Sequence, residues 1–204
     1  TAGIFQNTQE IDEWRAAGNG ILQSNVQPGD VRFVDRNHDG QINDKDKVNL
    51  GNGTPDFTLG LNLGFVYKGF DFSIVANGAF GQQIVQSYRN HTRPTPNYTT
   101  AILDRWHGEG TSNRIPRVTD SNINYQFSDL FIQNGDYLRL STLTLGYDFA
   151  KLFKGKAVSQ ARLYFQVQNL FIITGYDGMD PEIGFGSSNN SWVSGLDYGY
   201  YPRP

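Results

Sequence analysis

The sequence contains no cysteine and only one methionine. Disulfides, thiolate metal sites and thiol nucleophiles are therefore excluded. No apolar run reaches the roughly 18 residues of a membrane-spanning helix, but strands that cross a membrane alternate in polarity and give a much weaker hydropathy signal. The net charge is −3 and no basic cluster occurs, so the chain lacks the electrostatic footprint of a nucleic-acid-binding protein.

Catalytic signatures are missing as well. The sequence has no GxSxG, HExxH, P-loop or dinucleotide-binding fingerprint. Its three histidines, His38, His91 and His107, are scattered through loop-like segments, so we expect no enzyme. The first residues, TAGIFQNTQE, lack the charged start and apolar run of a signal peptide, which favours a chain that begins inside a longer protein.

Residues typical of β structure are abundant, with 23 glycines, 14 phenylalanines and 11 tyrosines. Apolar and polar residues alternate with period two in four stretches, which predicts antiparallel strands at 58–67, 70–82, 137–149 and 161–173. The first two strands are joined by the tight turn Lys68-Gly69, and the last two by the region 151–160. In the first strand one face carries Leu59, Leu61, Leu63, Phe65 and Tyr67.

The remaining segments are polar and rich in turn-forming residues. A short helix is predicted over 7–18 with Asn7 as its cap, and a short strand over 31–34. The segments 87–136 and 174–204 are too long for ordinary connections in a compact domain. We therefore expect a loop region at 1–57 and, at 58–204, the strands with two long loops.

Short turns at one end and long excursions at the other are typical of outer-membrane barrels, whose strands need about ten residues each. The alternative is a soluble β-sandwich, in which the leucine face would meet a second sheet. In that case the chain would be a secreted calcium-binding domain that binds glycans or a protein partner. Its sugar-stacking surface would comprise Trp106, Trp192, Tyr198, Tyr200 and Tyr201.

The stretch DRNHDGQINDKD, which starts at Asp35, has the spacing of a calcium-binding loop. Its oxygen donors fall at alternate positions, and Gly40 stands sixth, where a sharp turn is needed. The predicted ligands are Asp35, Asn37, Asp39, Gln41 through its carbonyl, and Asp46. The twelfth position holds Asp46 instead of the usual glutamate. Two alternatives to calcium therefore remain: the loop binds magnesium, or it is closed only by hydrogen bonds. An Asx-rich surface turn without any ion is the simpler alternative. We expect the ion to be structural.

Several ordered motifs together resemble one known family. They are GIFQNTQEID, PGDVRFVDRNHDGQIND, GNGTPDFTLGLNLGFVYKGFDFS, YLRLSTLTLGYDF, LYFQVQNLFIITGYDGMDPE and YPRP. In this order they resemble the C-terminal part of SusC/RagA-type TonB-dependent outer-membrane transporters. The resemblance implies an all-β fold: the C-terminal segment of a transmembrane, plugged β-barrel of about 22 strands, with long extracellular loops and one short helix near the N-terminus.

The resemblance also implies a function and partners. Such transporters sit in the outer membrane of Gram-negative bacteria and import oligosaccharides or peptides with energy from the TonB complex. They work with a SusD-like surface lipoprotein, which the stretch 106–114 could contact. This chain would need the remainder of the barrel and the plug, and would not transport alone. Lumen-facing side chains would contact polar cargo, or else hydrogen-bond the plug or neighbouring strands: Arg162, Tyr164, Gln166 and Gln168.

Overall fold

The computed structural model of the chain describes residues 1–87, 100–120, 122–149, 161–182 and 194–197. The chain forms two compact units. The first, which we call the loop unit, comprises Thr1–Gly51 and Gln86–Ile132; the second, which we call the sheet unit, comprises Asn52–Val85 and Gln133–Pro204. Most of the segment 87–136, which was predicted to be a long loop, is thus grouped with the N-terminal residues.

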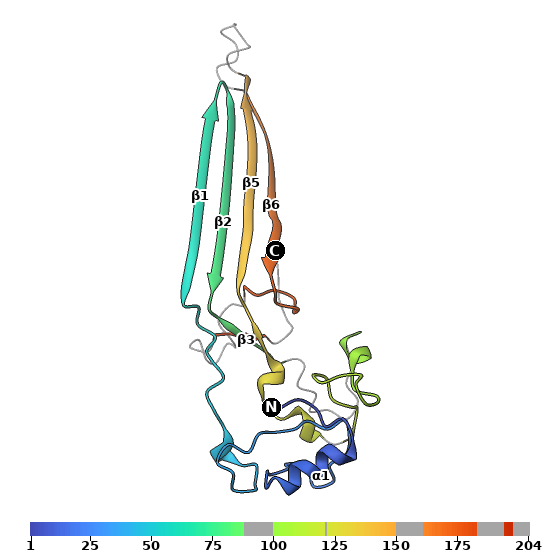
Figure 1. The fold of residues 1–204 in the computed structure, drawn as a ribbon. Coiled ribbons are helices and arrows are strands. Elements are labelled where there is room, and N and C mark those ends of the chain that lie inside the picture. The colour runs from blue at the N-terminus through green and yellow to red at the C-terminus, as the bar shows by residue number, and fades with distance from the viewer. Residues whose placement is uncertain (88–99, 121, 150–160, 183–193, 198–204) are drawn as a thin grey trace. The chain divides into compact units, whose positions relative to one another are not determined.

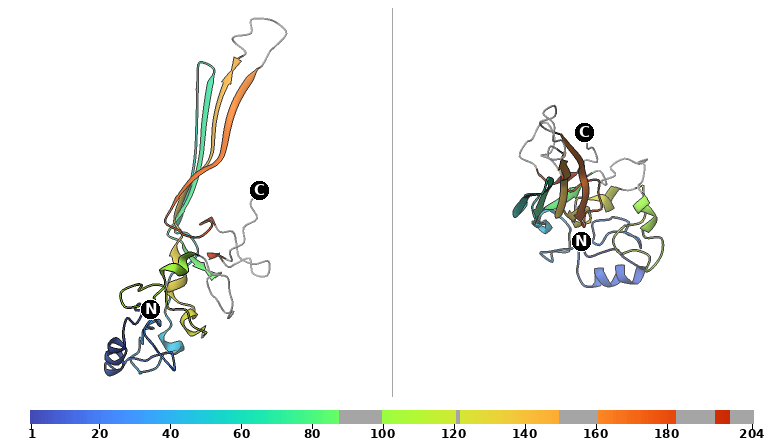
Figure 2. Two further views of the ribbon diagram at one scale, coloured as in Figure 1. Left: turned by 90° about the vertical axis from the view of Figure 1, so that its right-hand side faces the viewer. Right: turned by 90° about the horizontal axis from the view of Figure 1, so that it is seen from above.

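The sheet unit is built on four long antiparallel strands (Figure 1). In the order β1-β2-β5-β6 they are β1 (Phe57–Tyr67), β2 (Phe70–Phe80), β5 (Tyr137–Asp148) and β6 (Arg162–Thr174). Their ends lie within two residues of the predicted ranges. Two further views show these strands side by side in a single layer (Figure 2). The predicted antiparallel β fold is thus confirmed, although the described strands do not by themselves close a barrel.

The turn between β1 and β2 forms for a local reason. Lys68 and Gly69 have φ angles of 50° and 94°, and two consecutive residues with positive φ match the twist of a two-residue hairpin. The turn between β5 and β6, predicted at 151–160, lies outside the described residues. A second, smaller sheet has the order β4-β3-β7, with β3 (Gln83–Gln86), β4 (Ile132–Asn134) and β7 (Leu196–Asp197).

The loop unit contains the predicted helix. Helix α1 spans Thr8–Ala16, and the side chain of Asn7 accepts a hydrogen bond from the Glu10 N–H, as expected for its cap. The other helical turns are the 3₁₀ segments η1 (Asp44–Asp46), η3 (Thr100–Asp104), η4 (Asn122–Tyr125) and η5 (Asp129–Phe131). Among the described residues no helix has the length and apolar character needed to cross a membrane.

The strand predicted at 31–34 is not formed. Val31 makes only an isolated antiparallel bridge with Ile4. Around this bridge the two backbones do pair, since the Ala2 N–H donates to the Arg32 carbonyl at 2.8 Å and the Arg32 N–H donates to the Gly3 carbonyl at 2.9 Å, but the pairing is too short to form a strand. Ile4 and Val31 are nevertheless fully buried, and with Phe5 and Ile11 they form the small apolar core of this unit.

Candidate functional site

The four long strands give their sheet two chemically different faces. Register pairing keeps residues of the same kind on the same side of neighbouring strands. We call one side the apolar face. It carries Phe57, Leu59, Leu61, Leu63, Phe65 and Tyr67 of β1, Phe70, Phe72, Ile74, Ala76, Gly78 and Phe80 of β2, Leu138, Leu140, Leu143, Leu145 and Tyr147 of β5, and Leu163, Phe165, Val167, Phe171 and Ile173 of β6.

The apolar face is not covered by a second sheet. Leu59, Leu61 and Leu63 are 45%, 41% and 53% exposed, and Phe65 is 62% exposed. A soluble protein rarely shows a contiguous apolar patch of more than a few hundred Å². The sandwich alternative requires these leucines to be buried, and in the described structure they are open.

Aromatic side chains mark both ends of the apolar face. Phe57 stacks on Phe80 with 4.8 Å between ring centroids at one end, and Phe70 lies 4.5 Å from Tyr147 at the turn end. The eleven residues of β1 span about 36 Å along the strand. With the usual tilt of roughly 45° this corresponds to about 25 Å, the height of the apolar band of an outer-membrane barrel.

The opposite side, which we call the polar face, carries the predicted cargo-contacting residues. Arg162, Tyr164, Gln166 and Gln168 all lie on it, along β6, since their register partners are Asp148, Gly146, Thr144 and Thr142. On the neighbouring strands this face also carries Asn62 and Ser73, with Asn77, Ala79, Tyr137 and Arg139 toward the end away from the Lys68-Gly69 turn.

Arg162 already has a partner on this face. Its Nε donates to Asp71 Oδ1 at 2.9 Å, so the guanidinium reaches across β5 to β2. The intervening residue is Gly146, where a Cβ atom would come within 2.4 Å of the Asp71 carboxylate. A glycine at this position therefore lets the ion pair form across a strand. Contact of Arg162 and of the other three residues with cargo or with a plug stays a prediction.

A break in register lies midway along the polar face. Ser141 of β5 stands between two paired residues, Leu140 and Thr142, as an extra residue of a bulge. Its hydroxyl hydrogen-bonds to the amide oxygen of Asn77. The bulge also changes the parity of β5, so that Arg139 lies on the polar face although it shares odd numbering with Leu143 and Leu145. Strict period-two reasoning missed Arg139 for this reason.

The acidic loop is closed by hydrogen bonds to its own backbone. Asp35 is 1% exposed, and its carboxylate accepts from the N–H groups of Gly20 at 3.0 Å, Gly40 at 2.8 Å and Asp39 at 3.3 Å. The bond to Gly20 ties the loop to the residues that follow α1. A buried carboxylate with three backbone donors is well satisfied without an ion.

The other predicted ligands are engaged in the same way. Asp39 accepts from the Gln41 N–H at 3.0 Å and from the Asn37 side chain at 2.8 Å. Asp46 accepts from the N–H groups of Asn43 and Arg36, both at 2.8 Å, and the bond from Asn43 is the main cause that holds the pKa of Asp46 below its usual value.

Within the described residues no group of three His, Cys, Asp or Glu side chains is placed to hold a metal ion. Calcium or magnesium at these ligands stays a prediction.

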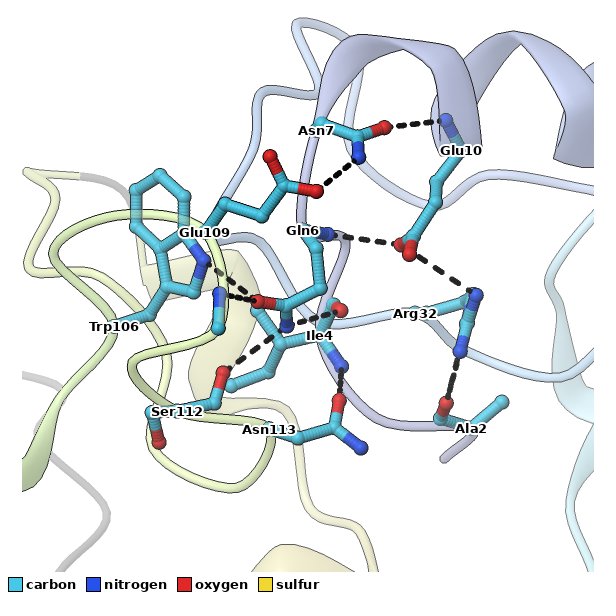
Figure 3. Close-up of polar contacts among 11 residues, drawn as sticks. Ala2, Ile4, Gln6, Asn7, Glu10, Arg32, Trp106, Glu109, Ser112 and Asn113 are labelled. Carbon is cyan, nitrogen blue, oxygen red and sulfur yellow. Dashed lines mark hydrogen bonds and ion pairs between the residues drawn. The ribbon is translucent and has the colours of Figure 1, made fainter.

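A polar network joins the N-terminal residues to the segment 106–113 inside the loop unit (Figure 3). Gln6 is its centre: its amide oxygen accepts from Trp106 Nε1 at 3.2 Å and Gly110 N at 2.9 Å, and its amide nitrogen donates to the Ser112 carbonyl at 3.0 Å. The Ile4 N–H donates to the side chain of Asn113 at 2.8 Å. Sequence reasoning did not find this network.

Trp106 therefore serves as a packing residue. Besides its bond to Gln6, its ring lies so close to Gly29 that a Cβ atom there would come within 2.5 Å. The other aromatic residues proposed as a sugar-stacking surface, Trp192, Tyr198, Tyr200 and Tyr201, lie outside the described residues. Contact of the stretch 106–114 with a lid protein stays a prediction.

Comparison with known proteins gives consistent relatives. The chain is 33% identical over 197 residues to a protein named TonB-dependent receptor P3 of Formosa agariphila, covering 91% of this chain and 19% of that protein. It is 31% identical over 185 residues to TonB-dependent receptor SusC of Bacteroides thetaiotaomicron, covering 90% of this chain and 17% of that protein. The chain thus spans about a fifth of the length of these curated relatives. No family model matches it.

Solved structures agree on the fold. A structure of the RagAB peptide transporter superposes with a TM-score of 0.57 at 24% identity over 74% of this chain and 16% of that one. The RagAB peptide importer in a "closed-closed" state gives a TM-score of 0.60 at 21% identity over 83% of this chain and 19% of that one. The curated relatives are named receptors, in agreement with the prediction that the chain is not an enzyme.

Proposed function

Because the chain is related over about nine tenths of its length to SusC-type TonB-dependent receptors, we propose that its long sheet is part of the wall of an outer-membrane importer. The apolar face would meet lipid, and the polar face would line the aqueous interior. The observation that carries this proposal is the open apolar face, whose β1 leucines are 41–53% exposed in the described structure and whose ends bear aromatic side chains. Lipid is the solvent in which such a face is stable.

The cargo would be a polar oligomer, either a peptide or an oligosaccharide. RagAB is named a peptide transporter, which supports the first, and the amides and hydroxyls of the polar face suit hydrogen bonding with both. Since Arg162 is paired with Asp71, the groups best placed for cargo are Tyr164, Gln166 and Gln168. The chain would act within a longer receptor, together with a plug, a SusD-like lipoprotein and the TonB complex of a Gram-negative cell.

The acidic loop would act as a clamp in the part of the receptor outside the membrane. Its hydrogen bonds join residues 35–46 to Gly20, and thereby to the end of α1. Calcium is a proposed further ligand of the same oxygens and would strengthen the clamp without taking part in transport.

Neighbouring residues of β1 offer a direct test of the wall. In the receptor that carries this chain, without other reactive cysteines, we would compare Leu61→Cys with Asn62→Cys in intact outer membranes. A water-soluble maleimide is expected to label Asn62→Cys and to leave Leu61→Cys unmodified. Labelling of both positions at similar rates, or of Leu61→Cys alone, would overturn the assignment of the faces.

A separate experiment tests the cargo. A strain that lacks the receptor is expected to lose uptake of either labelled peptides or labelled oligosaccharides, and uptake should return with the intact gene. Unchanged uptake of both classes would contradict the importer.

A further inference from the structure

One end of the polar face is buried although the sheet has a single layer. Tyr137, Arg139 and Ala79 are 7%, 6% and 5% exposed. Their neighbours on the apolar face, Leu138 and Leu140, are only partly buried. Along β5 this alternation indicates a cover on the polar face.

Among the described residues, the segment that follows β6, residues 175–182, contacts Arg139 at this end of the polar face. The Nη2 atom of Arg139 donates to both carboxylate oxygens of Asp180, at 2.8 and 3.0 Å, and its Nε lies 3.0 Å from the carboxylate of Glu182. From the other side, Gln82 donates to the Pro181 carbonyl at 3.2 Å. Asp180 is itself 3% exposed, so this ion pair is removed from solvent.

The start of the segment is fixed as well. After β6 the chain turns back (Figure 1). The turn is held by Thr174, whose hydroxyl donates to the Asp136 carbonyl at 2.7 Å and accepts from the Tyr176 N–H at 3.1 Å. Tyr176 is buried and its hydroxyl bonds to Asp197. Gly178 lies against the Tyr176 ring, where a Cβ atom would approach to 2.3 Å, so only glycine fits.

We propose that residues 175–182 form a strap across the polar face and that Arg139 positions it. The strap lies at the end of the strands away from the Lys68-Gly69 turn and covers the face that cargo would follow. It therefore narrows the route along that face, and the Arg139–Asp180 pair sets how far the strap stands from the strands. This inference rests on the proposed function, because the strap restricts passage only if the polar face lines an aqueous interior.

The test uses a reporter beneath the strap. Ala79→Cys places a thiol on the covered part of the polar face, and Asn62→Cys serves as a reporter on its open part. Asp180→Asn, which keeps the shape of the side chain and removes its charge, should release the strap. We expect the rate of maleimide labelling at Ala79→Cys to rise about tenfold and the rate at Asn62→Cys to stay unchanged.

A second, larger reagent tests whether release of the strap widens the space above the polar face. With the strap released, a polyethylene-glycol maleimide should gain more in labelling rate than a small maleimide. Asp71→Asn is the matched control, since it breaks the other ion pair of this face without touching the strap, and it should leave Ala79→Cys unaffected. Arg139→Lys keeps the positive charge but loses the paired contact, so it should give a smaller rise and carries the test if the Asp180→Asn receptor does not fold.

The outcomes are distinguishable. An unchanged rate at Ala79→Cys in both strap variants would overturn the strap while leaving the wall intact. Failure of the reagent to reach even Asn62→Cys would instead reject the proposed function. A rise that also appears at Leu61→Cys would mean general unfolding and would overturn the positioning role of Arg139.

Discussion

The two units of the chain place their apolar residues in opposite ways. In the loop unit Ile4, Phe5 and Val31 are buried to 1% exposure or less, and most charged side chains point outward. In the sheet unit the largest apolar side chains of β1 and β6 are exposed. The same hydrophobic effect explains both arrangements, provided that water surrounds the first unit and hydrocarbon meets the apolar face of the second.

The units also differ in how they use buried polar groups. The loop unit has a small apolar core, and its interior contains a hydrogen-bonded cluster around Asp30. The Asp30 carboxylate accepts from Arg117 Nε at 2.7 Å, Asn124 Nδ2 at 2.8 Å and the Gln27 N–H at 2.9 Å. Such clusters fix a unique conformation when every group is paired. The long sheet instead depends on its backbone ladder, which also pairs its polar groups where water is absent.

The largest expected effect on stability comes from a charge placed on the apolar face of the long sheet. Leu61→Arg places a charge near the middle of the apolar face, which should lower the free energy of unfolding in lipid vesicles by about 2–4 kcal/mol. Asn62→Arg, one residue away on the polar face, should change it little. The two values follow from urea titrations of the receptor. Equal losses for both variants would show that the faces do not differ in solvent.

A somewhat smaller effect is expected in the loop unit. Asp30→Ala leaves the donors of Arg117 and Asn124 without their acceptor, which should lower local stability by roughly 2–3 kcal/mol. Hydrogen exchange of peptides from residues 1–51 should then accelerate about 30- to 150-fold, while the β1–β2 hairpin keeps its protection. Asp12→Ala, at a largely exposed side chain of α1, is the control and should have no measurable effect. Loss of protection in both units would contradict their independence.

The acidic loop gives a third and smaller effect. Asp35→Asn removes a buried charge that accepts three N–H bonds, so we expect a loss of about 1–2 kcal/mol in the local stability of residues 20–46. Asp39→Asn, at an exposed side chain, should cost less than about 0.5 kcal/mol. Hydrogen exchange measured with and without a chelator separates hydrogen bonding from metal binding. If calcium holds the loop, both variants should lose protection equally and the chelator should reproduce the loss.

The smallest effect is one of pH. The backbone N–H of Asn43 holds the pKa of Asp46 below its usual value, so its hydrogen bonds contribute fully above about pH 4. They are lost as the pH falls through the lowered pKa. Pepsin cleavage between residues 35 and 47 should therefore rise only below about pH 4, with Asp46→Asn showing no such dependence. Cleavage that already increases near pH 6 would mean that a titratable group other than Asp46 controls the loop.

The sequence predicted the long strands because each has a strong local pattern. Ten residues of period two, as in β1, can hardly be read otherwise, and Lys68-Gly69 marks the hairpin. The helix α1 was equally legible from its Asn7 cap. The orientation of Arg139 could not be predicted from the sequence. A single extra residue, Ser141, moves the residues before it to the opposite face of β5, and the leucine pattern on either side of the bulge looks continuous.

The parts that escaped prediction depend on contacts between distant residues. The strand expected at 31–34 is reduced to a bridge between Val31 and Ile4, because its pairing with the N-terminal segment is too short. The Gln6 network joins residues about a hundred positions apart, and no local sequence pattern predicts such a pairing. The spacing of the acidic loop was clear, but the burial of Asp35 beneath Gly20 could be known only from the fold.

The order of the long sheet has a consequence for biogenesis. Among the described strands β1 and β6 each have one neighbour, so each leaves a row of peptide groups unpaired along its outer margin. Exposed to hydrocarbon, every such group costs several kcal/mol. In the proposed importer wall, both margins would therefore have to be paired before the ribbon meets lipid, and a copy with unpaired margins would be prone to aggregate.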